Sequence, residues 1–83
     1  MAENYKALTI AGSDTSGGAG MEADLKTFEE MGVYGMVVLT VIVAQNPKDW
    51  AHDIFPIELD TVKRQLATVG DGIGINAMKT GML

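Results

Sequence analysis

Residues 7–20, Ala-Leu-Thr-Ile-Ala-Gly-Ser-Asp-Thr-Ser-Gly-Gly-Ala-Gly, pass from a short apolar stretch into a turn made almost entirely of small residues. The apolar and β-branched residues 7–10 predict a strand, and Gly12 is placed to end it. The glycines that follow allow the backbone to approach a neighbouring strand or a ligand closely. We therefore predict a strand followed by a glycine-rich turn.

A helix is predicted directly after this turn. Its apolar residues share one helical face; they are Met21, Leu25, Phe28 and Met31. Gly32 is placed to end the helix, since a glycine commonly follows the last helical residue. Residues 33–44 then form a nearly continuous apolar, β-branched run. Such a run is typical of a strand that is buried on both faces of a parallel sheet.

Residues 45–56 are predicted to form a loop that contains two prolines and the aromatic residues Trp50 and Phe55. Loops of this length are uncommon in compact domains unless they cover or bind something, so we expect residues 47–56 to act as a lid. The second helix has its apolar face at Leu59, Val62, Leu66 and Val69, with Gly70 to end it. Residues 73–80 predict a third strand.

The predicted order β-α-β-α-β is the pattern of an α/β fold with parallel strands. Right-handed crossovers bring the carboxyl ends of such strands to one edge of the sheet, where open α/β sheets bind ligands. The segments delivered to this edge are residues 12–20, 43–46 and 80–82. We therefore expect the functional site there, beneath the predicted lid.

Composition excludes several classes of function. The 83 residues carry a net charge of −5, which disfavours sequence-independent binding to nucleic acid. Cysteine is absent and histidine occurs once, so the sequence offers no disulfide scaffold, thiolate metal site or histidine cluster. The longest apolar run, residues 36–44, is far shorter than the roughly 20 residues of a membrane span. We expect a cytoplasmic protein without a membrane partner.

The glycine-rich turn is not a Walker A loop, because Gly18 and Ala19 stand where that motif has its lysine and hydroxyl residue. Residues 18–23 match the dinucleotide pattern G-x-G-x-x-A, but the first glycine lies eight residues beyond Ile10 rather than at the strand end. No acidic residue for a ribose hydroxyl follows the second strand either. A dinucleotide-dependent oxidoreductase is thus a weakly supported alternative.

Several blocks of the sequence together resemble the vitamin kinases of the ribokinase-like superfamily, which comprise hydroxymethylpyrimidine (phosphate) kinases and the related bacterial pyridoxal kinases. These blocks are residues 7–14 (ALTIAGSD), 16–20 (SGGAG), 23–28 (ADLKTF), 33–36 (VYGM), 44–46 (AQN) and 77–83 (AMKTGML). The resemblance implies a three-layer α/β/α fold, of which residues 1–83 would be the N-terminal part of a single domain. Residues 50–54 (WAHDI) and 77–83 look more like the pyridoxal kinases, whereas Gln45 is typical of the pyrimidine kinases.

The resemblance implies ATP- and Mg²⁺-dependent phosphorylation of the hydroxymethyl group of pyridoxine, pyridoxal or pyridoxamine. Phosphorylation of hydroxymethylpyrimidine is the alternative within the superfamily, and a non-catalytic ligand-binding module is the alternative outside it. The superfamily's general base and anion hole lie farther along its chains, so we expect no catalytic residue and no turnover from these 83 residues alone. A homodimer is the oligomer that the resemblance implies.

The resemblance also implies a set of substrate-binding residues at the predicted edge: Gly12, Asp24, Val43, Gln45, His52 and Met82. Asp24 would accept a hydrogen bond from the substrate, and the amide of Gln45 suits a ring nitrogen and its neighbouring substituent. His52 would belong to the lid, and the thioether of Met82 would pack on the ring face. Lys79, the one cation of the predicted third strand, is interpreted as an ion-paired edge residue without a catalytic role.

Overall fold

The computed structural model describes residues 5–45, 48 and 52–81. Its elements, in chain order, are β1 (Lys6–Asp14), α1 (Gly20–Glu30), β2 (Tyr34–Gln45), β3 (His52–Pro56), α2 (Leu59–Ala67), the π-helical η1 (Thr68–Ile73) and β4 (Ala77–Thr80). Among the helices in these ranges, none is both long enough and apolar enough to span a bilayer.

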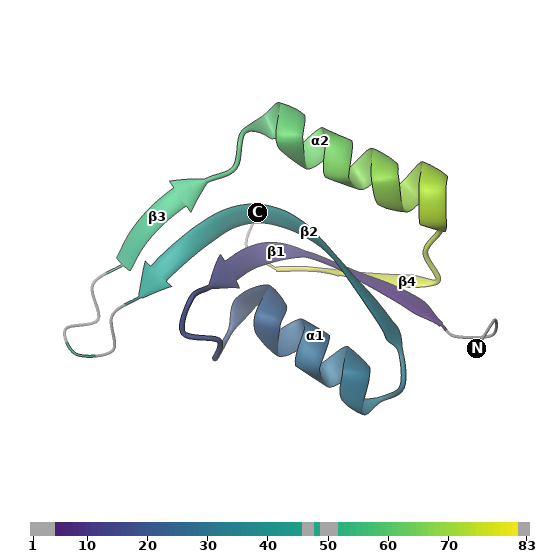
Figure 1. The fold of residues 1–83 in the computed structure, drawn as a ribbon, viewed down its shortest axis with the longest axis horizontal. Helices are drawn as coiled ribbons and strands as arrows, with labels where there is room; N and C mark the ends of the chain where they lie inside the picture. The colour runs from purple at the N-terminus through teal and green to yellow at the C-terminus, as the bar shows by residue number, and fades with distance from the viewer. Residues whose placement is uncertain (1–4, 46–47, 49–51, 82–83) are drawn as a thin grey trace.

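The strands form one sheet in the order β3-β2-β1-β4 (Figure 1). β1 runs parallel to both β2 and β4, as the β-α-β-α-β pattern predicted. β3 is an addition to that pattern, because it pairs with β2 in the antiparallel direction. The sheet is therefore mixed but mainly parallel, and the carboxyl ends of β1, β2 and β4 meet at one edge.

The two α-helices cover opposite faces of the sheet, α1 below it and α2 above it in Figure 1. The face toward α2 carries the hydrophobic core, in which Leu8, Met36 and Val38 of the sheet pack with Val69 of η1. The face toward α1 admits a close approach, since a Cβ on Gly35 would lie 2.9 Å from a methyl carbon of Leu25. This arrangement is the three-layer α/β/α architecture expected from the sequence.

The end of α1 is partly as predicted. Gly32 has a φ of +69°, and the helix ends just before it. Met31, which its spacing assigned to the apolar face, is the C-cap residue and is 72% exposed. Leu25 and Phe28, which the same spacing assigned to that face, do lie against Gly35 of β2.

β1 is longer than predicted, because Gly12 lies within the strand rather than at its end. The register with β2 shifts between Ala11 and Ser13, so Gly12 occupies an irregularity in an otherwise continuous ladder. A Cβ at Gly12 would come within 2.5 Å of Cγ1 of Val41. The glycine thus permits close packing of two neighbouring strands, and β1 continues to Asp14.

The predicted loop over residues 45–56 is wrong at its second half. His52–Pro56 form β3, whose partners are Val41–Gln45 of β2, with Gln45 opposite His52. Pairing with β2 overrides the weak local preference of this proline-bounded segment. Of the predicted lid, residues 47 and 49–51, with Trp50 among them, lie outside the described residues.

The helix after β3 does not end at Gly70. After α2 the chain continues through the wider turn of η1, in which the N–H of Gly74 donates to the carbonyl of Val69 at 2.7 Å. Gly74 has the positive φ, +95°, and ends the helical segment. This path places Val69 in the core at 5% exposure, and β4 consequently begins at Ala77 rather than at residue 73.

Candidate ligand-binding site

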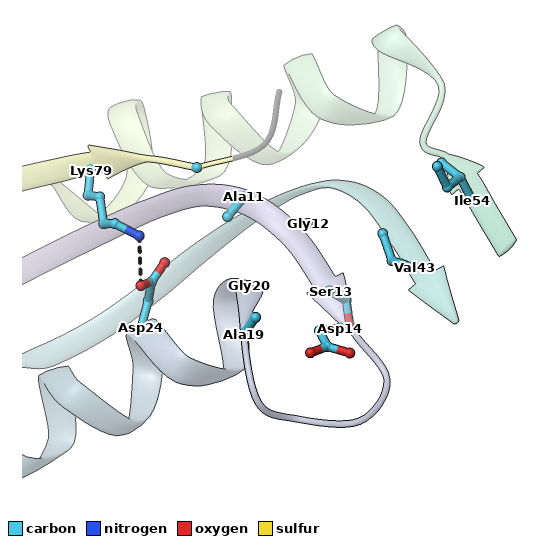
Figure 2. A pocket seen from close by; sticks show the side chains of 11 residues that line it. Ala11, Gly12, Ser13, Asp14, Ala19, Gly20, Asp24, Val43, Ile54 and Lys79 are labelled. Atoms are coloured by element: carbon cyan, nitrogen blue, oxygen red, sulfur yellow. Dashed lines mark hydrogen bonds and ion pairs between the residues drawn. The ribbon is translucent and has the colours of Figure 1, made fainter. Parts of the chain in front are cut away.

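A pocket of about 290 Å³ lies at the carboxyl edge of the parallel strands (Figure 2). Its walls come from the end of β1 and the glycine-rich turn, the first turns of α1, and residues of β2, β3 and β4. Most of the lining is apolar or backbone. The charged groups that line it are Asp14, Asp24 and Lys79, so the pocket combines apolar walls with a few polar groups, as small-molecule sites commonly do.

The glycine-rich turn folds back onto β1. Gly20 has a φ of +65°, and a Cβ there would lie 2.5 Å from the carbonyl oxygen of Gly12. Ser13 and Gly20 form an isolated antiparallel bridge at the same place. A side chain at position 20 would therefore clash with backbone, and glycine is what allows α1 to begin against the strand.

The carboxylate of Asp14 lies inside this turn. Its Oδ1 accepts hydrogen bonds from the hydroxyl of Ser16 at 2.8 Å and from the N–H of Ser16 at 3.0 Å. These bonds, joined by the backbone N–H groups of Ala19 and Gly18, outweigh the loss of hydration and lower the pKa of Asp14. The turn therefore directs its amides at a carboxylate of its own chain, and not into an open anion site.

Glu22 of α1 ties the helix to the end of β1. Its side chain accepts a hydrogen bond from the hydroxyl of Ser13 and another, at 2.9 Å, from the N–H of Asp14. Burial raises the pKa of Glu22, but these two hydrogen bonds outweigh it, and the net pKa is lowered. The ionised carboxylate thus joins the two elements that form one wall of the pocket.

Asp24 is held by two donors from two different strands. Thr9 of β1 donates its hydroxyl to Oδ2 at 2.6 Å, and Nζ of Lys79 on β4 lies 2.8 Å from Oδ1, the contact drawn in Figure 2. Burial raises the pKa of Asp24, but the hydrogen bonds from Lys79 and Thr9 and the lysine charge outweigh it, and the pKa is lowered. An ionised, oriented carboxylate therefore borders the pocket.

The structure brings together three of the predicted site residues, since Gly12, Asp24 and Val43 all line the pocket. The backbones of Gln45 and His52 are opposite one another where the β2–β3 ladder ends, and Met82 lies outside the described residues. The ion pair expected for Lys79 is present, on the edge strand β4.

Three residues that line the pocket were not among the predicted substrate-binding residues: Asp14, Ile54 and Lys79. Asp14 lies in the segment predicted to reach this edge, and Ile54 lies in the predicted lid, but its place in the wall follows from the unpredicted strand β3. The small polar residues around Asp14 were a usable signal, because Asp and Ser at such spacing commonly bond to turn backbone. For Lys79 no local signal existed, since its partner is 55 residues away.

A family model described as phosphomethylpyrimidine kinase matches residues 14–83, which is most of the chain. The chain belongs to this family. Pyridoxine kinase of Bacillus subtilis (strain 168) is 68% identical to it over 80 residues, which cover 95% of this chain and 30% of that protein. The hydroxymethylpyrimidine/phosphomethylpyrimidine kinase of the same organism is 48% identical over 79 residues, or 95% of this chain and 29% of that protein.

Solved structures of the family share the fold described above. The ADP complex of Bacillus subtilis pyridoxal kinase superposes with a TM-score of 0.93 and 66% identity, covering 98% of this chain and 31% of that one. Staphylococcus aureus pyridoxal kinase in complex with AMP-PCP and pyridoxal gives a TM-score of 0.89 at 56% identity, covering 96% and 30%. The chain thus spans about 30% of the length of these family members.

Proposed function

We propose that residues 1–83 form the N-terminal part of a single vitamin-kinase domain, which phosphorylates the hydroxymethyl group of pyridoxine, pyridoxal or pyridoxamine with ATP. The observation that carries the choice of vitamin is the difference in identity, 68% to a pyridoxine kinase against 48% to a pyrimidine kinase of the same organism. Phosphorylation of hydroxymethylpyrimidine is the second candidate, which the description of the matching family favours.

The described pocket suits the acceptor side of this reaction. Phosphoryl transfer depends mainly on positioning and on charge stabilisation, so the acceptor alcohol must be held in a defined orientation. Asp24 offers a carboxylate oxygen to a substrate donor, and Gly12 and Val43 border the same space. Gln45, His52 and Met82 are proposed as further ring contacts on the sequence resemblance alone.

ATP and Mg²⁺ are proposed for the whole protein, and no described residue is assigned to either. The amides of the glycine-rich turn are directed at Asp14, which makes that turn unsuitable for a triphosphate. Within residues 5–45, 48 and 52–81, no group of three His, Cys, Asp or Glu side chains is placed to hold a metal ion. A cytoplasmic homodimer is part of the same proposal, and light scattering of the purified protein would test the dimer.

The experiment uses the full-length protein that contains this sequence. ADP release is measured with Mg-ATP and, separately, pyridoxine, pyridoxal and hydroxymethylpyrimidine. We expect release with all B6 vitamers at a higher kcat/KM than with the pyrimidine. The reverse order would favour the pyrimidine kinase. Binding of the vitamers without any ADP release would overturn the enzyme and leave a ligand-binding module.

A further inference from the structure

We propose that Thr9 and Lys79 are positioning residues for the acceptor substrate, which they orient through the carboxylate of Asp24. This inference rests on the proposed function, because it concerns how the same pocket holds its vitamin. It assigns a functional role to Thr9 and Lys79, for which the sequence alone predicted none. Neither residue needs to touch the substrate for this role.

The geometry around Asp24 defines the orientation of its carboxylate. Nζ of Lys79 donates to Oδ1 of Asp24 at 2.8 Å, and the hydroxyl of Thr9 donates to Oδ2 at 2.6 Å. Rotation of the carboxylate would therefore break a hydrogen bond. The donors come from β4 and β1, while Asp24 itself is on α1. Three elements therefore converge on a single side chain beside the pocket.

Thr9, Asp24 and Lys79 differ in their exposure to solvent. Thr9 is fully buried and the side chain of Asp24 is 14% exposed, whereas that of Lys79 is 56% exposed. A carboxylate that loses most of its hydration needs donors to remain ionised, and two are supplied. Each carboxylate oxygen has more than one acceptor site, so Asp24 retains capacity for a donor from a ligand.

Charge also connects Lys79 to Asp24. Lys79 is the one cation among the described residues that line the pocket, and its ammonium pairs with the carboxylate of Asp24. The carboxylate of Asp14, on the other side of the turn, is satisfied by Ser16. Of the two carboxylates that line the described part of the pocket, Asp24 is the one whose direction depends on Lys79 and Thr9.

The test is a double-mutant cycle on the full-length protein, measured with pyridoxine. Lys79→Met should raise KM about tenfold with kcat within about twofold, since the charge-assisted hydrogen bond that orients Asp24 toward the bound substrate is lost. In the Asp24→Asn background the same substitution should change KM by less than about twofold, because the carboxylate charge that pairs with Lys79 is already gone. Thr9→Val should behave in the same way.

Controls separate positioning from a structural effect. Lys79→Arg should restore KM, and Lys63→Met on the exposed side of α2 should leave both constants unchanged. For variants without measurable activity, calorimetric titration with pyridoxine in the absence of ATP gives the affinities for the same double-mutant cycle. Circular dichroism shows whether each variant is folded.

Two results would overturn the inference. If Lys79→Met and Asp24→Asn multiply in their effects, Lys79 contacts the ligand directly. If the single substitution Lys79→Met changes neither KM nor the affinity for pyridoxine, Lys79 does not position the substrate. If the wild-type protein binds pyridoxine but releases no ADP, only the proposed enzymatic activity is contradicted, because the double-mutant cycle can still be measured by binding affinity. If the wild-type protein does not bind pyridoxine, both the proposed function and this inference are contradicted.

Discussion

The side-chain amide of Gln65 on α2 pairs with the backbone of Leu39 on β2 in both directions. Oε1 of Gln65 accepts from the N–H of Leu39 at 2.8 Å, and Nε2 donates to its carbonyl at 2.9 Å. β3 pairs with β2 only from Val41 onward, so Gln65 takes the place of a neighbouring strand just before the ladder begins.

Replacement of this amide should be costly. Gln65→Leu keeps most of the side-chain volume but leaves two partly buried backbone groups of Leu39 unpaired, and we expect a loss of about 2 kcal/mol in the free energy of unfolding. Urea unfolding of the full-length protein measures it. Arg64→Ala is the matched control on the same helix. It removes only an exposed ion pair with Asp60, so its effect should stay below about 0.5 kcal/mol. Equal effects of the two variants would contradict this account.

Two glycines with similar dihedral angles should respond differently to alanine. Gly20 and Gly32 have φ of +65° and +69°, but a Cβ at Gly20 would strike the carbonyl of Gly12, whereas a Cβ at Gly32 meets nothing within 4 Å. Gly32→Ala should cost about 1 to 2 kcal/mol, the penalty of the backbone conformation alone. Gly20→Ala adds a clash and should cost about 3 kcal/mol or more. Thermal unfolding compares them, and similar melting temperatures would exclude the close approach of α1 to β1.

The contact between α1 and the sheet should show coupling. Gly35→Ala forces a Cβ against Leu25 and Phe28, and we expect a destabilisation of about 1 to 2 kcal/mol. Leu25→Ala vacates part of this space, so Gly35→Ala should cost less in that background. Denaturant unfolding of the four proteins gives the coupling energy. Strictly additive effects would mean that the helix does not rest on this part of β2.

Acid should destabilise the protein through the carboxylates around the pocket. The pKa values of Asp14, Glu22 and Asp24 are all lowered in the folded state, so the unfolded chain binds protons more readily. Their contribution to stability is therefore complete above the ordinary carboxyl pKa of about 4 and is lost as the pH falls below it.

Lys79→Met isolates the contribution of Asp24 to this acid effect. The substitution removes the lysine that lowers the pKa of Asp24, so the stabilities of wild type and variant should differ most at neutral pH and converge as the pH falls below about 4. Unfolding midpoints measured across this range supply the comparison. A difference that is constant with pH would show that Lys79 acts by packing alone.

The sequence predicted the elements whose pattern is local. The apolar spacing in α1 and the position of Gly32 sufficed for that helix and its end, and the continuous apolar run sufficed for β2. The predicted end of the second helix at Gly70 was wrong, because residues 70, 72 and 74 are all glycine and nothing local indicates which one takes a positive φ. Burial of Val69 against the sheet, a tertiary effect, carries the helical path on to Gly74.

For the candidate site too, features with a local pattern were predictable, whereas those that depend on distant contacts were not. The parallel-strand rule and the glycine-rich turn predicted the edge of the sheet at which the pocket lies, and Gly12 and Val43 line that pocket. The wall formed by Ile54 and the partnership of Lys79 with Asp24 depend on pairings between distant segments. Those pairings exist only in three dimensions, and no pattern along the chain encodes them.

The alternation of side chains along β1 has a consequence for substitutions. Leu8 and Ile10 point to the hydrophobic core beneath α2, while Thr9 between them points to α1 and reaches Asp24. The hydrophobic core and the hydrogen bond to the pocket-lining Asp24 therefore depend on alternate positions of one strand. Substitutions on the α1 side can therefore alter the pocket, while the core that keeps the chain folded remains untouched.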